Sequence, residues 1–274
     1  EWADKNGADI ISSSLGYTLP RYETKDMNGR TSIATQAAEM AASKGILVIN
    51  SAGNEGNKNW EVIGSPADAD NVLAIGAIDP YNDAHINFSS FGPTADGKLK
   101  PNVSSLGQAI VANKNGYQTQ FGTSFSCPLV AGFAACAWQS NPEWTRAEIF
   151  TEIEKSGHLY PYYDYAHGYG IPQASYFTGD KKQLADHQFK INAFSDYVLI
   201  NFNEEFFNED KKQKLNFYYG FINEENKVVS FGVLQPDSTT LNIIIPKYLL
   251  SQKIKYKMQA HFEGDTQVID LEDR

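Results

Sequence analysis

Short runs of β-branched and other apolar residues alternate with helical patterns over the first two thirds of the chain. Residues 8–16 (ADIISSSLG) predict a strand that enters a glycine turn, and residues 46–50 (ILVIN) predict a second strand. Residues 71–78 (NVLAIGAI) predict a third, which is apolar on both faces as buried parallel strands are. This alternation predicts an α/β fold, a mostly parallel sheet with helices on both faces.

Two further segments have the periodicity of amphipathic helices. In residues 31–45, Thr31 or Ser32 is the expected N-cap. The expected core face of this helix comprises Ile33, Ala37, Met40 and Ala41. Residues 145–157 place Thr145 and Glu148 in the spacing of a capping box, which predicts a short helix.

The pattern changes after about residue 180. Aromatic and β-branched runs then alternate with period two and are separated by polar turns such as NEED, NEEN, PDS and EGD. Six or seven strands without a helical pattern predict an antiparallel β-sandwich. We therefore expect two domains, 1–180 and 181–274, with the charged residues 179–183 (GDKKQ) at the boundary. The second domain is expected to stabilise the first or to bind a sugar or a surface.

Composition limits the classes of partner. The 274 residues include 33 acidic and 23 basic side chains, a net charge of −10 without a basic cluster, which argues against nucleic acid as a partner. The apolar run after Ser124 ends at Trp138, short of the roughly 20 residues that cross a bilayer, so no membrane span is expected. The chain opens on Glu1 without a signal pattern, and we expect that it begins inside a larger protein.

The two cysteines, Cys127 and Cys136, lie nine positions apart in one predicted helix. This spacing puts them on opposite faces, separated by about 13 Å of helical rise, so they cannot pair. Without a CxxC motif or a nearby histidine they make a poor metal site. We expect both to be small buried apolar residues.

Residues 120–138 (QFGTSFSCPLVAGFAACAW) carry the first candidate chemistry. Ser124 lies at a strand-to-helix transition, where backbone N–H groups and the helix dipole stabilise a developing negative charge. The helix after it is apolar almost all round and is expected to run through the centre of the domain. The alternative is that Thr123 or Ser124 only caps a core helix.

Residues 49–57 (INSAGNEGN) favour the chemical alternative. There a buried strand ends in small residues and an asparagine, Asn54, flanked by glycines. A fixed amide donor at the carboxyl end of a strand is what an oxyanion hole requires, and open α/β sheets place ligands at such ends. We therefore expect Ser124 and Asn54 to share one cleft.

With these stretches the sequence resembles the subtilisin-like serine peptidases (subtilases, peptidase family S8). GTSFSCP resembles their nucleophile motif Gly-Thr-Ser-x-Ala-x-Pro, with Ser126 for the usual alanine and Leu129 where many members have histidine. SAGNEG (51–56) matches the family's oxyanion segment, and SSLG (13–16) resembles the strand that pairs with the substrate backbone. KPNVSSLG (100–107) is similar to the family's Lys-Pro-Asp-Val-x-Ala-Pro-Gly. NPEWTRAEI and GYGIPQA resemble the closing helix and final segment, so the likeness covers about residues 1–177.

The resemblance implies an endopeptidase that forms an acyl-enzyme on Ser124, with Asn54 in the oxyanion hole. Gly64 resembles the floor of the primary specificity pocket, where a missing side chain leaves room for a large substrate residue, although it is nearly as well explained as a turn glycine. The resemblance further implies substrate-binding roles for Ser13, Ser14, Leu15, Gly16, Ala52, Gly53, Gly64, Gly122 and Thr123.

The family's catalytic Asp and His precede the nucleophile, and in family order Glu1 falls after both. None of the five histidines has a sequence context that makes it a substitute, so each is expected to be a surface or structural residue. We expect the isolated chain to be inactive, a part of a larger peptidase that could bind the missing N-terminal part. The alternative is a non-catalytic pseudo-peptidase that binds extended peptides.

A third class, a nucleotide-binding α/β protein, lacks support because no Gly-x-x-x-x-Gly-Lys-Ser/Thr loop is present. No cofactor is required by the expected chemistry. Many subtilases bind calcium, and residues 65–71 (SPADADN) offer suitable carboxylates, although acidic loops are more often simply solvated. The family's habit of export implies an extracellular or periplasmic location.

Overall fold

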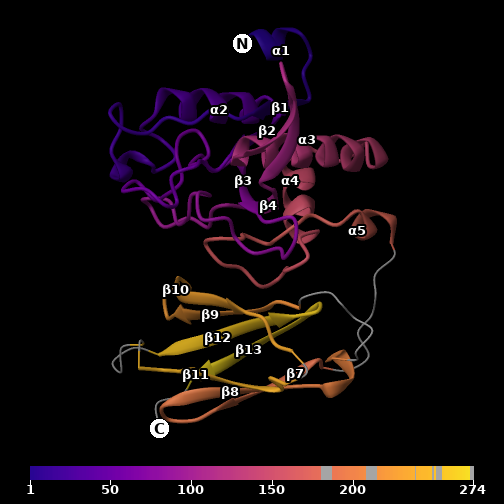
Figure 1. The fold of residues 1–274 in the computed structure, drawn as a ribbon. Helices are drawn as coiled ribbons and strands as arrows, with labels where there is room; N and C mark the ends of the chain where they lie inside the picture. Colours follow the sequence, from indigo (N-terminus) through magenta and orange to yellow (C-terminus); the bar gives the residue numbers. More distant parts are fainter. Residues whose placement is uncertain (180–186, 208–214, 238, 249, 251–254, 272–274) are drawn as a thin grey trace. The chain divides into compact units, whose positions relative to one another are not determined.

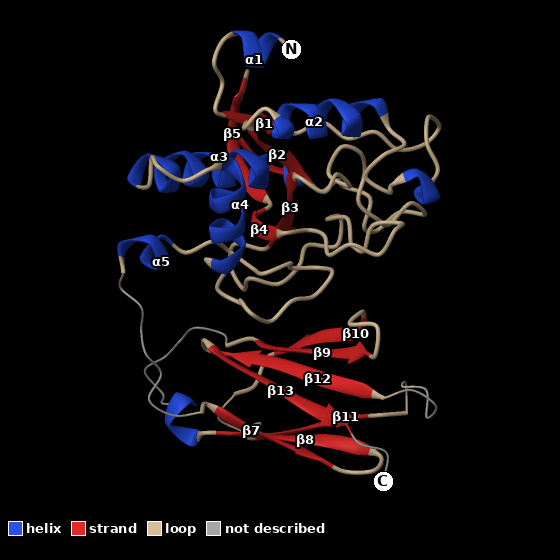
Figure 2. Cartoon of the chain, turned by 180° about the vertical axis from the view of Figure 1, so that it is seen from behind, coloured by secondary structure: helices blue, strands red, loops and turns tan. Residues whose placement is uncertain are grey.

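The computed structural model describes residues 1–179, 187–207, 215–237, 239–248, 250 and 255–271 (Figure 1). By its internal contacts the chain divides into two compact units, Glu1–Lys181 and Lys182–Arg274. Most of the expected boundary at 179–183 lies outside the described residues. Figure 2 shows that the first unit mixes helices with strands, whereas the described part of the second consists mainly of strands.

A four-stranded parallel sheet forms the centre of the first unit. Its strands lie in the order β1-β2-β3-β4, and their bounds are β1 (Ile10–Ser13), β2 (Leu47–Ser51), β3 (Val72–Ile78) and β4 (Val103–Leu106). Every residue of β2 and β3 is buried, which confirms the prediction of parallel strands covered on both faces.

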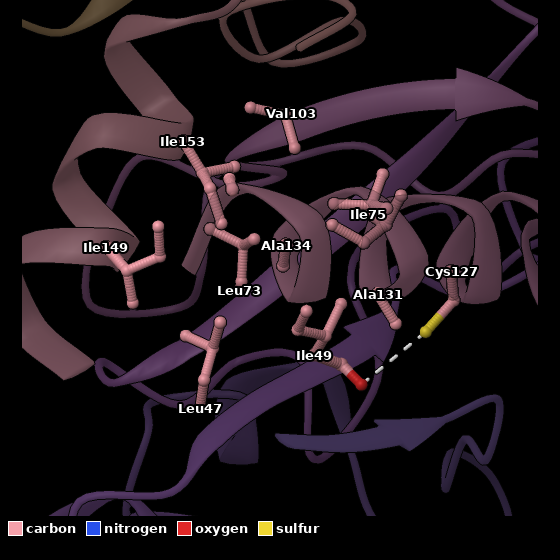
Figure 3. Packing of buried hydrophobic residues seen from close by; sticks show 12 residues of the cluster. Leu47, Ile49, Leu73, Ile75, Val103, Cys127, Ala131, Ala134, Ile149 and Ile153 are labelled. Atoms are coloured by element: carbon pink, nitrogen blue, oxygen red, sulfur yellow. Dashed lines mark hydrogen bonds between the residues drawn. The ribbon is translucent and has the colours of Figure 1, made fainter. Parts of the chain in front are cut away.

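Helices cover the two faces of this sheet because successive strand residues point to opposite sides. Leu47 and Ile49 of β2 join a core cluster with α3 (Thr123–Ser140) and α4 (Arg146–Lys155), part of which Figure 3 shows. Val48, between them, packs instead with Ala38 of α2 (Ile33–Ser43). The α/β architecture with helices on both faces is therefore confirmed.

The remaining elements of this unit are short. They are α1 (Trp2–Lys5), the 3₁₀ helix η1 (Thr24–Asp26), the hairpin of β5 (Gln108–Asn113) and β6 (Gly116–Phe121), and α5 (Ala174–Thr178). The expected capping box of α4 is present, since Thr145 N–H donates to Glu148 Oε2 at 2.7 Å and Glu148 N–H donates to Thr145 Oγ1 at 3.3 Å.

The predicted core face of α2 is wrong except at Ala41, which is partly buried against the core cluster. Ser32 caps the helix, as its Oγ accepts from Ala34 N–H at 3.2 Å, but Ile33 and Met40 are 77% and 60% exposed. The buried residues of the helix are Thr35, Ala38 and Ala42. Small side chains on that face let the helix backbone approach the sheet, so the larger residues are left on the outside.

Helix α3 is also less central than its composition predicts. It packs on the sheet through Cys127, Val130, Ala134 and Ala137, and Figure 3 shows the Cys127 thiol beside Ile49, whose carbonyl accepts its hydrogen bond at 3.5 Å. Leu129 on the other side is 51% exposed. Cys136 is exposed as well, which corrects the expectation that both cysteines are buried, and both are free thiols. Besides its sheet-facing side, α3 is covered around Phe133, whose ring packs against Phe177 of α5, and around Trp138, whose Nε1 donates to Trp144 O at 2.9 Å.

The second unit contains two antiparallel sheets with the strand orders β10-β9-β12-β13 and β11-β8-β7. Its elements are β7 (Phe189–Ala193), β8 (Tyr197–Phe202), η2 (Glu204–Phe207), β9 (Phe217–Asn223), β10 (Val228–Leu234), β11 (Asn242–Pro246), β12 (Tyr256–Phe262) and β13 (Asp265–Leu271). Both sheets contribute to one core rich in aromatic rings, including Phe189, Phe202, Phe217 and Phe262. The antiparallel β architecture expected after residue 180 is therefore confirmed.

Candidate active site

Three chain segments meet at the carboxyl edge of the parallel sheet. They are residues 13–16 at the end of β1, residues 52–54 after β2, and the first turn of α3. Thr123 of that turn donates from both its N–H and its hydroxyl to Asn54 Oδ1, each at 2.9 Å, and its Oγ1 accepts from Gly53 N–H at 3.3 Å. The structure thus brings Asn54 beside the residue that precedes Ser124.

These bonds fix the orientation of the Asn54 amide. A backbone N–H only donates, so the atom that faces Thr123 N must be the oxygen Oδ1, and Nδ2 is left on the other side of the carboxamide. A Cβ added to Gly122 would lie 3.5 Å from Asn54 Nδ2 and 3.7 Å from Ser124 N. Two N–H donors therefore border one space, which the missing side chain of Gly122 leaves open.

Ser124 is half-buried in the first turn of α3, directly after β6. Its position confirms the predicted strand-to-helix transition, and at a helix N-terminus the unpaired N–H groups favour negative charge. Ser14 Oγ donates to the Ser124 carbonyl at 3.0 Å, and no described histidine or carboxylate hydrogen-bonds to Ser124. The described residues therefore place a serine hydroxyl near N–H donors, without a histidine or carboxylate bonded to it.

The histidines of the first unit have structural partners instead. His167 Nδ1 lies 3.0 Å from the buried Asp164 carboxylate, and its Nε2 accepts from His85 N–H at 3.1 Å. His85 Nε2 lies 3.0 Å from Ser89 O, and His158 Nδ1 accepts from Ile171 N–H at 2.8 Å. These contacts hold loops together and give each ring a structural role.

The two remaining histidines belong to the second unit. His187 Nδ1 lies 3.2 Å from the Asp265 carboxylate, and His261 Nδ1 lies 2.7 Å from Thr266 Oγ1. All five histidines thus have partners other than Ser124 within the described residues.

The lowered pKa values of His85 and His158 should make the free energy of unfolding depend on pH. Desolvation lowers the pKa of His85 and of His158 to about 4, with the nearby His167 adding to the effect, so both rings are neutral in the folded state at pH 6.5. Between pH 6.5 and 4 the unfolded chain binds more protons than the folded chain, and the free energy of unfolding is expected to fall as pH falls through this window.

Urea unfolding followed by tryptophan fluorescence measures this effect in the first unit alone, because Trp2, Trp60, Trp138 and Trp144 all belong to it. His158→Asn keeps an acceptor for Ile171 N–H but cannot titrate, so its pH dependence should be shallower than that of the wild type. An unchanged slope would show that His158 does not contribute.

The expected substrate strand is accessible. Leu15 is 60% exposed, and a Cβ at Gly16 would meet nothing within 4 Å. Besides the bond from Ser14 to Ser124, two contacts hold this segment: Asn50 Nδ2 donates to Leu15 O at 3.0 Å, and Cys127 Sγ donates to Ser13 O at 3.3 Å. The chain at 13–16 is therefore held in place while its outer side remains open.

Gly64 lies against residues 17 and 18. Its N–H donates to Ala52 O at 3.2 Å, which links it to the segment that holds Asn54. A Cβ at Gly64 would lie 3.3 Å from the Thr18 methyl and 3.6 Å from Tyr17 O. Thr18 thus limits the free space beside Gly64, and the role of Gly64 as a pocket floor stays a prediction.

Two residues that differ from the family motifs, Ser126 and Asn102, form hydrogen bonds with neighbouring residues. Ser126, in place of alanine, donates its hydroxyl proton to Leu106 O at 3.1 Å. Asn102, in place of aspartate, accepts from Lys100 Nζ at 2.9 Å and donates to Glu154 Oε1 at 2.7 Å. Burial lowers the pKa of Lys100 to about 8 and raises that of Glu154, while each charge opposes the shift of the other.

The carboxylates of the proposed calcium loop have protein partners. Asp68 accepts from Gly29 N–H at 2.8 Å and from Thr35 Oγ1 at 2.6 Å, and Asp70 pairs with Lys98. The described residues contain no group of three or more His, Cys, Asp or Glu side chains arranged to hold a metal ion. Calcium binding at 65–71 stays a prediction. None of the described helices combines the length and the apolar character needed to cross a bilayer.

Comparison with known proteins shows which family this chain is similar to. The model of the Subtilase family (Peptidase_S8) matches residues 1–175. Serine protease AprX of Bacillus subtilis (strain 168) is 34% identical over 171 residues, which cover 54% of this chain and 37% of that protein. Subtilisin DY of Bacillus licheniformis is 35% identical over 157 residues, which cover 57% of this chain and 52% of that protein.

Solved structures agree. Sphericase matches with a TM-score of 0.50 at 25% identity, and the S41 psychrophilic protease with 0.50 at 27%, each over 63% of this chain and 59% of the other. The chain spans between about a third and a half of the length of the curated relatives it matches. Since the family match covers well over half of its residues, this chain belongs to the subtilase family of serine peptidases.

Proposed function

We propose that this chain supplies the nucleophile and the oxyanion hole of a serine endopeptidase, with Ser124 as the nucleophile and Asn54 as a donor. One observation carries the proposal: Thr123 holds Asn54 Oδ1 with two hydrogen bonds of 2.9 Å, which leaves Asn54 Nδ2 and Ser124 N–H bordering the same space beside Gly122. Preorganised donors of this kind stabilise the charge that develops on a carbonyl oxygen during acyl transfer.

The reaction follows from this arrangement. Ser124 Oγ attacks the scissile carbonyl carbon while its proton passes to a histidine outside the described chain. The carbonyl oxygen becomes an oxyanion that accepts from Asn54 Nδ2 and Ser124 N–H. Collapse of this intermediate breaks the C–N bond, the histidine protonates the departing amine, and an acyl-enzyme remains on Ser124. Water, deprotonated by the same histidine, then hydrolyses the ester and restores the hydroxyl.

The substrate is proposed to be a peptide or protein in extended form. The exposed residues 14–16 suit pairing with a substrate strand, in which main-chain hydrogen bonds give affinity and pockets give specificity. The residue before the scissile bond would enter between this segment, residues 52–54 and Gly64. Because Thr18 limits the space at Gly64, we propose a preference for side chains of moderate size.

The base and its acid partner are proposed to come from residues upstream of Glu1, as the resemblance to the family implies. The 274-residue chain is then inactive alone, since Ser124 without a base is a weak nucleophile. The chemistry requires no cofactor, and calcium remains a proposal for residues 65–71. By the habit of the family we propose an extracellular or periplasmic location.

The absence of a histidine or carboxylate beside Ser124 within the described residues favours a second candidate, a peptide-binding pseudo-peptidase. The two candidates differ in the reactivity of the serine. A fluorophosphonate should label Ser124 in the protein that carries its upstream residues, called the extended protein below, and should not label the 274-residue chain. Absence of label in both, with retained binding of extended peptides, would support the pseudo-peptidase.

A further inference from the structure

We propose that Ser14 is a positioning residue that holds the first turn of α3, and with it Ser124, against the substrate strand. The proposal rests on the proposed function of Ser124 and adds a role that neither the nucleophile motif nor the oxyanion segment contains. It follows from the Ser124 carbonyl, which loses its helical hydrogen-bond donor because residue 128 is proline, and which accepts a hydrogen bond from Ser14 instead.

The removed bond is in the turn that carries Ser124. In an α-helix the carbonyl of residue i accepts from the N–H of residue i+4, so Ser124 O would accept from residue 128. Residue 128 is proline, which has no N–H, and it lies inside α3 (Thr123–Ser140). Pro128 therefore deprives the carbonyl of the nucleophile residue itself of its helical donor.

Ser14 replaces that donor. Its Oγ donates to Ser124 O at 3.0 Å across 110 residues of sequence. A second bond joins the same two segments, since Cys127 Sγ donates to Ser13 O at 3.3 Å. Residues 13 and 14 thus fasten both ends of the turn 124–127, and they belong to the segment proposed to pair with substrate.

This connection matters because one turn holds two reacting groups. Ser124 provides both the attacking Oγ and a backbone N–H to the oxyanion hole, so a displacement of the turn moves both relative to Asn54. A misplacement of 1 Å in a positioned group costs about 10²-fold in rate. The bond from Ser14 should therefore act on the rate of the chemical step more than on substrate binding.

The test is a double-mutant cycle between Ser14 and Pro128 in the extended protein. Ser14→Ala should lower kcat about tenfold and change KM less than about twofold, because the lost interaction positions the nucleophile. Ser14→Thr keeps a hydroxyl and should restore kcat to within about threefold of the wild type. Pro128→Ala supplies the missing N–H, so in that background Ser14→Ala should change kcat by less than about threefold.

A second readout does not depend on peptidase activity. In the 274-residue chain, Ser14→Ala should lower the melting temperature by about 2–4 °C, and in the Pro128→Ala background by less than about 1 °C. Ser14 and Pro128 are both exposed, so neither substitution disturbs a packed core. Coupling between the two positions in both kcat and melting temperature is the result expected.

The contrary results are separable. If the extended protein is active and Ser14→Ala has the same effect with and without Pro128, or raises KM alone, the positioning role is wrong while the proposed function stands. If the extended wild-type protein hydrolyses no peptide, the proposed function fails and the positioning role fails with it.

Discussion

Ser124→Ala should lower kcat for peptide hydrolysis by the extended protein by about 10⁶-fold, the scale that loss of the nucleophile has in subtilisin. We propose that the Ser124 hydroxyl forms the acyl-enzyme, and alanine would leave the donors in place without a nucleophile. The residual rate should be about 10³-fold above that in water, because oxyanion stabilisation and substrate binding persist.

Ser140→Ala is the matched control, since Ser140 ends the same helix and its hydroxyl donates to Cys136 O at 3.0 Å. Its turnover of a chromogenic peptide should equal that of the wild type. A Ser124→Ala protein that retains a hundredth or more of the wild-type kcat would place the nucleophile elsewhere.

Asn54→Ala should lower kcat by about 10²- to 10³-fold, the measured scale for the loss of the oxyanion asparagine in subtilisin. KM should change little, because the ground-state carbonyl gains less from the donor than the oxyanion does. Asn54→Asp keeps an oxygen for Thr123 N–H but replaces Nδ2 by an anionic oxygen beside the developing charge. It should therefore be at least as slow as Asn54→Ala.

Steady-state kinetics on one peptide substrate measures both variants. Asn57→Ala, in the exposed part of the same loop, is the control and should leave kcat unchanged. A loss that appears in KM while kcat is retained would mean that Asn54 binds substrate uniformly and does not stabilise the oxyanion.

Local sequence signals predicted local structure well. The capping box of α4 and the N-cap of α2 depend on residues two or three apart, and both formed as expected. The core face of α2 could not be predicted in the same way. Its sequence offers alanines on several faces, so periodicity does not distinguish them, and close packing on the sheet selected the face of Thr35 and Ala38.

The roles of Ser124 and Asn54 stay predictions, whereas the contacts that bring their segments together could not be predicted from the sequence. Motif order identified Ser124 and Asn54, but the bonds from Thr123 to Asn54 join residues 69 apart and depend on how β2 and α3 meet. The bond from Ser14 to Ser124 spans 110 residues, and its only sequence signal is Pro128, which removes the helical donor. Such contacts follow from the packing of the sheet edge.

The most direct test of the account is a structure of the extended protein after reaction with a fluorophosphonate. The phosphorus should be bonded to Ser124 Oγ, and the phosphonyl oxygen should lie about 2.7–3.1 Å from both Asn54 Nδ2 and Ser124 N. An adduct on another residue, or a phosphonyl oxygen directed to solvent away from Asn54, would contradict the claim that these two residues form one catalytic site.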